Sequence, residues 1–185
     1  MRQHRLILVG GGARCGKSDL ALALARRLGR RRLFLATAQA RDGEMRERIG
    51  RHRRTRGDDY RTLEEPLAVP EVLRQTADDD VVVIDCLTLW LTNLLLAGHE
   101  PEAVLRRVKE LADVLRQRPA HAVVVTSEVG LGLVPETPLG RTFRDVAGLA
   151  HQRLAAAADE VYFGALGVML RLKPGPVVPA EEVPS

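Results

Sequence analysis

The sequence predicts an α/β fold built on a mostly parallel central sheet with helices on its faces. Three observations lead to this prediction. Short apolar runs alternate with longer segments of helical periodicity, the run at 81–84 is apolar at every position, and a glycine-rich turn joins the first run to the first helix. Such alternation is typical of β–α–β units with right-handed crossovers. A run without polar positions indicates a strand covered on both faces.

The expected strands span residues 5–9, 33–36, 81–84, 122–126, 160–163 and 168–172. The expected helices span residues 19–28, 43–56, 68–76, 87–97, 101–118 and 139–158. In the last helix, spacings of three and four place one apolar set on a single face: Leu139, Phe143, Val146, Ala150 and Leu154. We expect residues 1–173 to form a single domain and the proline-containing segment 174–185 to be a disordered tail.

Composition limits the classes of function. A chain of 185 residues is long enough for one well-packed domain. The net charge of +4 suits small anionic substrates, whereas an aromatic content of 3% argues against a platform for single-stranded nucleic acid. No apolar run is long enough to span a membrane. Cys15 and Cys86 form neither a metal-ligand spacing nor a disulfide framework, so we expect a cytoplasmic protein. Because of the low aromatic content, we also expect that it binds no nucleic acid.

The most informative motif follows the first strand directly. It reads Gly11-x-x-x-x-Gly16-Lys17-Ser18 and leads into the first expected helix. Glycines allow successive backbone N–H groups to point at phosphate oxygens, and the helix N-terminus adds a favourable dipole. In this phosphate-binding pattern the lysine reaches the outer phosphates and the serine hydroxyl binds Mg2+. The alternative is a glycine-rich turn between strand and helix that binds nothing.

A second feature is the acid that ends the apolar strand at 81–84. Asp85 stands where P-loop proteins hold Mg2+, directly or through water. It also precedes the helix expected from residue 87, so capping of that helix is a second interpretation. The two roles are compatible.

The expected helix at 43–56 is rich in arginine. Met45, Ile49 and His52 fall on one face of this helix, and Arg48 and Arg56 lie one turn before and after the histidine. Neighbouring cations disfavour the imidazolium form, and a neutral imidazole can attack phosphorus while guanidinium groups grip phosphate oxygens. The alternative is a solvated cationic helix whose histidine packs against Met45 and Ile49.

Several motifs taken together carry a resemblance to a known family. They are the loop 11–18, the Ala-Thr-Ala-Gln segment 36–39, the Arg-Ile-x-x-His-Arg pattern at 48–53, the Asp-Cys-Leu-Thr-x-Trp pattern at 85–90 and the Glu-Val-Gly segment 128–130. In these motifs the chain closely resembles the bifunctional adenosylcobinamide kinase/adenosylcobinamide-phosphate guanylyltransferase family of cobalamin biosynthesis, from about residue 6 to residue 172.

The resemblance implies a RecA-like P-loop fold, a homotrimer and two reactions. ATP or GTP phosphorylates adenosylcobinamide. GMP then passes from GTP, through a guanylylated histidine, to adenosylcobinamide phosphate, with release of pyrophosphate. The histidine of the family motif falls on His52, and Lys17 is the other expected catalytic residue.

The resemblance also implies a set of nucleotide contacts. They fall on Gly11, Gly12, Ala13, Arg14, Cys15, Gly16, Lys17 and Ser18, on Thr37, Ala38 and Gln39, on Arg53, Arg54, Thr55 and Arg56, and on Glu64 and Asp85. The expected Mg2+ ligands are Ser18 and Asp85. We interpret Glu64 as an acceptor for the guanine edge.

Two other functions stay open at this point. One is a different P-loop small-molecule kinase or ATPase in which His52 is structural, and the other is a non-catalytic, nucleotide-regulated binder. The segment after Glu128 is either a substrate loop or turn chemistry. We expect Trp90 to pack in the core and Asn93 to cap or bridge loops. The four remaining histidines are expected to be surface or structural residues: His4, His99, His121 and His151.

Overall fold

The computed structural model describes residues 4–39, 43, 47, 50, 59–76 and 78–179. One eight-stranded sheet forms its centre, with the strand order β3-β2-β4-β5-β1-β6-β7-β8. The strands are β1 (Leu6–Gly11), β2 (Arg32–Ala36), β3 (Arg61–Glu64), β4 (Val81–Asp85), β5 (His121–Val125), β6 (Glu160–Ala165), β7 (Val168–Lys173) and β8 (Val178–Pro179). The six neighbouring strands β3, β2, β4, β5, β1 and β6 pair in parallel. The β6–β7 and β7–β8 pairs are antiparallel.

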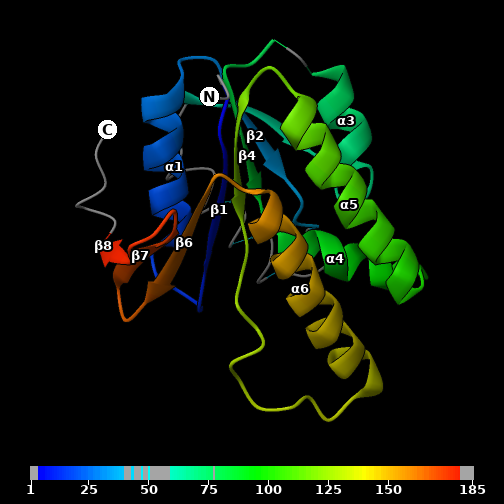
Figure 1. Ribbon diagram of the computed structural model, residues 1–185. Coiled ribbons are helices and arrows are strands. Elements are labelled where there is room, and N and C mark those ends of the chain that lie inside the picture. The colour runs from blue at the N-terminus through cyan, green and yellow to red at the C-terminus, as the bar shows by residue number, and fades with distance from the viewer. Residues whose placement is uncertain are drawn as a thin grey trace.

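Helices cover both faces of the sheet (Figure 1). The helix α1 (Lys17–Leu28) lies on one face. The other face carries α3 (Val69–Gln75), α4 (Leu87–Leu96), α5 (Pro101–Gln117) and α6 (Pro138–Ala157). None of the helices in the described ranges combines the length and apolar character that a bilayer crossing requires. The parallel α/β architecture predicted from the sequence is therefore observed.

Alternation along the strands divides the core into two apolar clusters. Leu6 and Leu8 of β1 face α4, α5 and α6, whereas Ile7 and Val9 face α1. These four side chains are at most 4% exposed, as expected for a strand buried on both faces. Because β1 lies inside the sheet between β5 and β6, its carboxyl end reaches the edge at a fixed position.

The structure differs from the sequence prediction at two points. The polar strand Arg61–Glu64 was not expected, because only its parallel pairing with the buried β2 marks it as a strand. Within the expected tail 174–185, Val178–Pro179 pair with β7 and extend the sheet, so the tail prediction does not hold for these two residues. Of the expected helix at 43–56, only residues 43, 47 and 50 are described, and all three are helical.

Candidate nucleotide site at the carboxyl edge of the sheet

The phosphate-loop motif forms the turn between β1 and α1. Gly11 and Gly16 adopt φ values of 145° and 92°, which favour glycine, and Arg14 adopts a φ of 54°. Gly16 is the N-cap of α1 and has no side chain to compete for the exposed N–H groups. Lys17 Nζ donates to the Gly12 carbonyl at 2.9 Å, so the lysine folds back along the loop. This is the strand–turn–helix context that the motif requires.

A close contact fixes the start of the loop. A Cβ atom on Gly11 would lie 2.6 Å from the Gly164 carbonyl oxygen and 2.7 Å from Cys15 Sγ. Cys15 is buried, and its sulfur lies equally close to where a Cβ atom of Gly164 would stand. The side chain of Cys15 therefore packs the loop against β6, a structural role that the sequence motif does not reveal.

The two expected Mg2+ ligands lie together. Ser18 Oγ in the first turn of α1 donates to Asp85 Oδ2 at the end of β4, over 3.1 Å. A hydroxyl and a carboxylate are hard oxygen ligands, and Mg2+ is commonly bound by one or two such groups together with substrate phosphates. The described residues contain no cluster of three His, Cys, Asp or Glu side chains suited to a metal, so nucleotide phosphates and water would supply the other ligands. The donor pair fits this mode of binding.

Thr37 connects the ends of β2 and β4. Its hydroxyl donates to the Cys86 carbonyl at 2.7 Å and accepts from the Cys86 N–H at 2.8 Å. Its backbone N–H donates to the Asp85 carbonyl, and Asn93 Nδ2 donates to the Thr37 carbonyl at 2.8 Å. Thr37 is fully buried. Its polar groups are therefore used to hold the edge together, and Ala38 follows directly from this anchor.

Two expectations for α4 are met. Trp90 is 1% exposed within the core, and its indole Nε1 donates to the Leu67 carbonyl. Asn93 bridges two segments, since its amide also donates to the Pro66 carbonyl at 3.2 Å. Burial, followed by the nearby Asp85 charge, raises the pKa of Cys86 to about 11, so this thiol is not a nucleophile at neutral pH.

The remaining predicted residues lie farther away or outside the description. Glu64 ends β3, four strand positions from β1, which corresponds to roughly 19 Å at the usual strand spacing. Ala38 and Gln39 follow β2 at the same edge as the phosphate loop. His52, Arg53, Arg54, Thr55 and Arg56 lie outside the described residues, so the predicted nucleophile and its arginines remain predictions.

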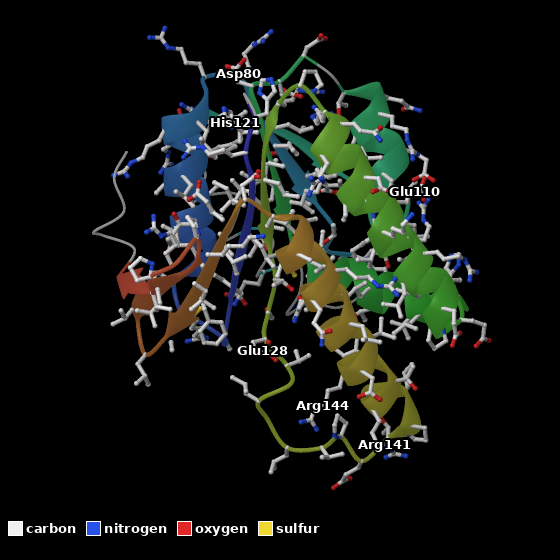
Figure 2. The ribbon with its side chains drawn as sticks, in the orientation of Figure 1. Asp80, Glu110, His121, Glu128, Arg141 and Arg144 are labelled. Atoms are coloured by element: carbon white, nitrogen blue, oxygen red, sulfur yellow. The ribbon has the colours of Figure 1, made fainter. Side chains whose placement is uncertain are left out.

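Sequence reasoning missed a polar network beside the phosphate loop. His151 Nε2 lies 2.7 Å from Thr126 Oγ1, and His151 Nδ1 lies 3.6 Å from Glu128 Oε2. Glu128 Oε1 accepts the Gly130 N–H at 2.5 Å, and Arg144 donates to the Gly130 carbonyl at 2.6 Å. Figure 2 shows Glu128 where the chain leaves β5 and Arg144 on the side of α6 toward the same loop.

The histidine of this network is half-buried, and burial lowers its pKa, against a smaller opposing effect of the Glu128 charge. It is therefore neutral at pH 7. A sequence signal was present, because His151 follows Ala147 by four residues and precedes Leu154 by three, on the buried face of α6. This spacing predicts that the ring is buried, but it does not predict that Thr126 and Glu128 are its partners.

Comparisons with known proteins identify the family of this chain. Residues 7–172 match the family described as cobinamide kinase / cobinamide phosphate guanyltransferase. The chain is 44% identical to the bifunctional adenosylcobalamin biosynthesis protein CobP of Pseudomonas aeruginosa, covering 92% of this chain and 98% of that protein. It is 38% identical to the bifunctional adenosylcobalamin biosynthesis protein CobU of Escherichia coli, covering 91% and 99%. The protein of the same name from Salmonella typhimurium is 40% identical, with the same coverage.

Two solved structures share the fold. The RadB recombinase matches with a TM-score of 0.53 and 15% identity over 90% of this chain and 79% of that chain. The second structure is an ATPase domain, which matches with a TM-score of 0.51 and 12% identity over 97% of this chain and 81% of that chain. Both confirm the predicted RecA-like P-loop architecture. The family assignment comes from the sequence matches along nearly the whole chain: this protein belongs to the cobinamide kinase / cobinamide phosphate guanyltransferase family.

Proposed function

We propose that this protein catalyses both reactions named in its family's description. ATP or GTP phosphorylates adenosylcobinamide, and GMP then passes from GTP through a guanylylated His52 to adenosylcobinamide phosphate, with release of pyrophosphate. The observation that carries the proposal is the Ser18–Asp85 pair, 3.1 Å apart beside a P-loop, in a chain that matches the family over residues 7–172.

Each described residue has a role that its position supports. Backbone N–H groups from Gly11 to Ser18 bind the phosphates. Lys17 leaves its contact with the Gly12 carbonyl to reach the outer phosphates. Ser18 and Asp85 would hold Mg2+, which neutralises charge on the phosphate oxygens during transfer. Asp85 is joined through the Thr37–Cys86 hydrogen bonds to the end of β2, where Ala38 and Gln39 stand as nucleotide contacts.

The guanylyl half of the proposal rests on His52. A neutral imidazole would attack the α-phosphorus of GTP, forming a P–N bond while the bond to the pyrophosphate oxygen breaks. Arg53, Arg54, Thr55 and Arg56 would bind phosphate oxygens in this step, and Glu64 would accept hydrogen bonds from the guanine edge. We also propose a single domain over residues 1–173, a cytoplasmic location and a homotrimer. Light scattering at several protein concentrations tests the last of these.

The decisive experiment is covalent labelling with GTP that carries 32P at the α-phosphate. We expect acid-labile, base-stable label on the wild-type protein, which is the behaviour of a phosphoramidate. We expect no label on His52→Ala, because this variant lacks the imidazole that would form the P–N bond. His99→Ala is the matched control, since His99 is exposed beyond the end of α4, and it should label normally. Label that persists in His52→Ala would refute the assigned nucleophile.

The two reactions should also separate. His52→Ala should retain phosphorylation of adenosylcobinamide, because phosphoryl transfer needs the P-loop and the metal pair and not an imidazole. Product analysis by chromatography after incubation with ATP or GTP measures this step and shows which triphosphate serves it. Equal loss of both activities in a folded His52→Ala protein would contradict the separation. An enzyme that makes neither product would refute the proposed function as a whole.

A further inference from the structure

Strand β5 lies between β4, which carries Asp85, and β1, which leads into the phosphate loop, and the chain beyond β5 carries a second carboxylate, Glu128. Asp85 pairs with Val125 of β5 on one side, and Val9 of β1 pairs with Val125 on the other. The chain therefore leaves β5 between the Mg2+ ligand and the phosphate loop. Beyond the strand, the Glu128 N–H donates to the Gly11 carbonyl at 2.9 Å, and the Ser127 N–H approaches Thr88 Oγ1 at 3.4 Å. The segment 127–128 is therefore held by the phosphate loop on one side and by α4 on the other.

From this placement we infer that Glu128 is a catalytic residue of the phosphoryl-transfer step, binding the acceptor hydroxyl and taking its proton. The inference rests on the proposed function, whose first reaction transfers a phosphoryl group to an alcohol. In this step the acceptor O–H bond breaks and the proton goes to the Glu128 carboxylate. A bond forms from the acceptor oxygen to the γ-phosphorus, and the bond from the γ-phosphorus to the bridging oxygen breaks, releasing the nucleoside diphosphate.

Glu128 fits this role better than the other acids of the described site. Asp85 is committed to Ser18, and Glu64 lies four strand positions from the phosphate loop. The Glu128 side chain is 26% exposed, so it remains accessible to a substrate at the edge. One of its oxygens is oriented by the Gly130 N–H and the other faces His151. The carboxylate is thus held in one orientation yet open to solvent.

His151 is the positioning residue in this arrangement. When its Nε2 accepts a hydrogen bond from the Thr126 hydroxyl, its proton is on Nδ1, the nitrogen that faces Glu128. Because the ring is half-buried and neutral, it orients the carboxylate without adding a positive charge, which would make the carboxylate a weaker base. Among the described residues, Arg144 also contacts this segment, and its guanidinium donates to the Gly130 carbonyl.

The loop that follows offers a surface for a large acceptor. Leu131, Leu133 and Val134 are 82%, 96% and 66% exposed, in direct continuity with Glu128. Arg141 donates to the carbonyls of Pro135 and Glu136, so the loop is tied to α6 at its far end as well. A corrinoid alcohol has an apolar ring surface that could contact these side chains while its hydroxyl approaches Glu128. Such a contact would give these exposed apolar side chains a function beside a phosphate site.

The first test is Glu128→Gln in the full-length protein, with Glu136→Gln as the matched control. Glutamine keeps an oxygen for the Gly130 N–H but cannot take a proton at neutral pH. We expect kcat for adenosylcobinamide phosphorylation to fall by about 100-fold or more, the scale of general-base catalysis. The KM for the nucleotide, the melting temperature and the labelling of His52 by GTP should be unchanged. The acidic limb of the pH profile of kcat should disappear. Glu136→Gln, an exposed change in the same loop, should match the wild type.

The second test is His151→Gln, which removes the ring and leaves Glu128 in place. We expect a smaller loss of kcat, about 10-fold, and a higher KM for the acceptor alcohol, with the acidic limb retained because the base is still present. Rescue toward the wild-type rate by His151→Asn would support an orienting amide in place of the Nδ1 proton.

Three results would overturn the inference. They are a Glu128→Gln enzyme with more than about a third of the wild-type kcat, a retained acidic limb in that variant, or a loss that affects phosphorylation and His52 labelling alike with a lower melting temperature. The last result would make Glu128 a structural anchor. A wild-type enzyme that phosphorylates no adenosylcobinamide refutes the proposed function itself, and is distinguished from the other results because it requires no variant.

Discussion

At the scale of single residues, the phosphate loop depends on a contact that no motif describes. Gly11 has a φ of 145°, and the space where its Cβ would stand is occupied by Gly164 and the Cys15 sulfur. Glycine is required at this position for two independent reasons, one conformational and one steric.

We therefore expect Gly11→Ala to lower the free energy of unfolding by about 2–4 kcal/mol, combining backbone strain with overpacking. Gly12→Ala is the control, because a Cβ there would meet no atom within 4 Å, and its stability should stay within about 0.5 kcal/mol of the wild type. Urea denaturation followed by circular dichroism measures both. Equal stability of the two variants would show that the contact yields easily.

Residue types explain which site residues could be predicted. Lys17, Ser18 and Asp85 carry chemistry at fixed positions relative to a strand end, so the sequence was sufficient to place them together. The roles of Cys15 and His151 depend on partners far away in the chain, Gly164 and Thr126 respectively. A single sequence gives no signal for such partners, because they are set by packing between elements and not by local spacing.

At the scale of elements, the edge of the site depends on how β2 is joined to β4. The Thr37 hydroxyl both donates to and accepts from the backbone of Cys86, in a fully buried position. The strands themselves could be predicted from their apolar runs, whereas this connection and the polar strand β3 could not. β3 has only one half-buried position in four, so its strand character comes from pairing with β2.

Thr37→Val preserves the shape of the side chain but removes the hydroxyl, so the Cys86 N–H and the Cys86 carbonyl each lose a hydrogen-bond partner. We expect unfolding to become easier by about 1–3 kcal/mol, the cost of leaving buried polar groups unpaired. Nucleotide affinity should weaken as well, because Ala38 and Gln39 extend from this anchor. Thr92→Val is a suitable comparison: its hydroxyl donates to the Thr88 carbonyl within α4, and its loss should change stability by less than about 0.5 kcal/mol. Parallel urea titrations and nucleotide titrations by fluorescence provide the measurements.

At the scale of the whole molecule, acid stability is set in part at the opposite edge of the sheet. Asp80 accepts hydrogen bonds from the backbone N–H groups of Arg30 and Arg31 and from the Arg31 guanidinium. The bonds from the Arg31 backbone and side chain are the largest causes that lower the pKa of Asp80 to about 2 from 3.8. Figure 2 shows Asp80 at the end of the molecule away from Glu128.

A carboxyl group whose pKa is lower in the folded state stabilises the fold above its unfolded pKa and loses this effect as the pH falls through the folded value. We expect wild-type stability to decline between about pH 4 and pH 2, and Asp80→Asn to show a shallower decline in that window. Glu71, whose pKa is lowered by Arg107, contributes in the same direction, so the difference between the two proteins isolates Asp80. Thermal melts across this range measure it, with the exposed Asp78→Asn as the control. Parallel curves for Asp80→Asn and wild type would contradict the assignment.

The strand order has a consequence for how the protein comes apart. Apart from Glu64 and the groups that α1 and α6 contribute, the described polar groups of the site extend from β2, β4, β5 and β1, each of which has a paired neighbour on either side. Fraying starts where pairing is one-sided, at β3 and at the two-residue β8. Amide hydrogens within the paired strands β1, β4 and β5 should therefore be among the last to exchange with deuterium. A protease that cuts between β7 and β8 would leave these strands paired, so the remaining fragment should still bind nucleotide.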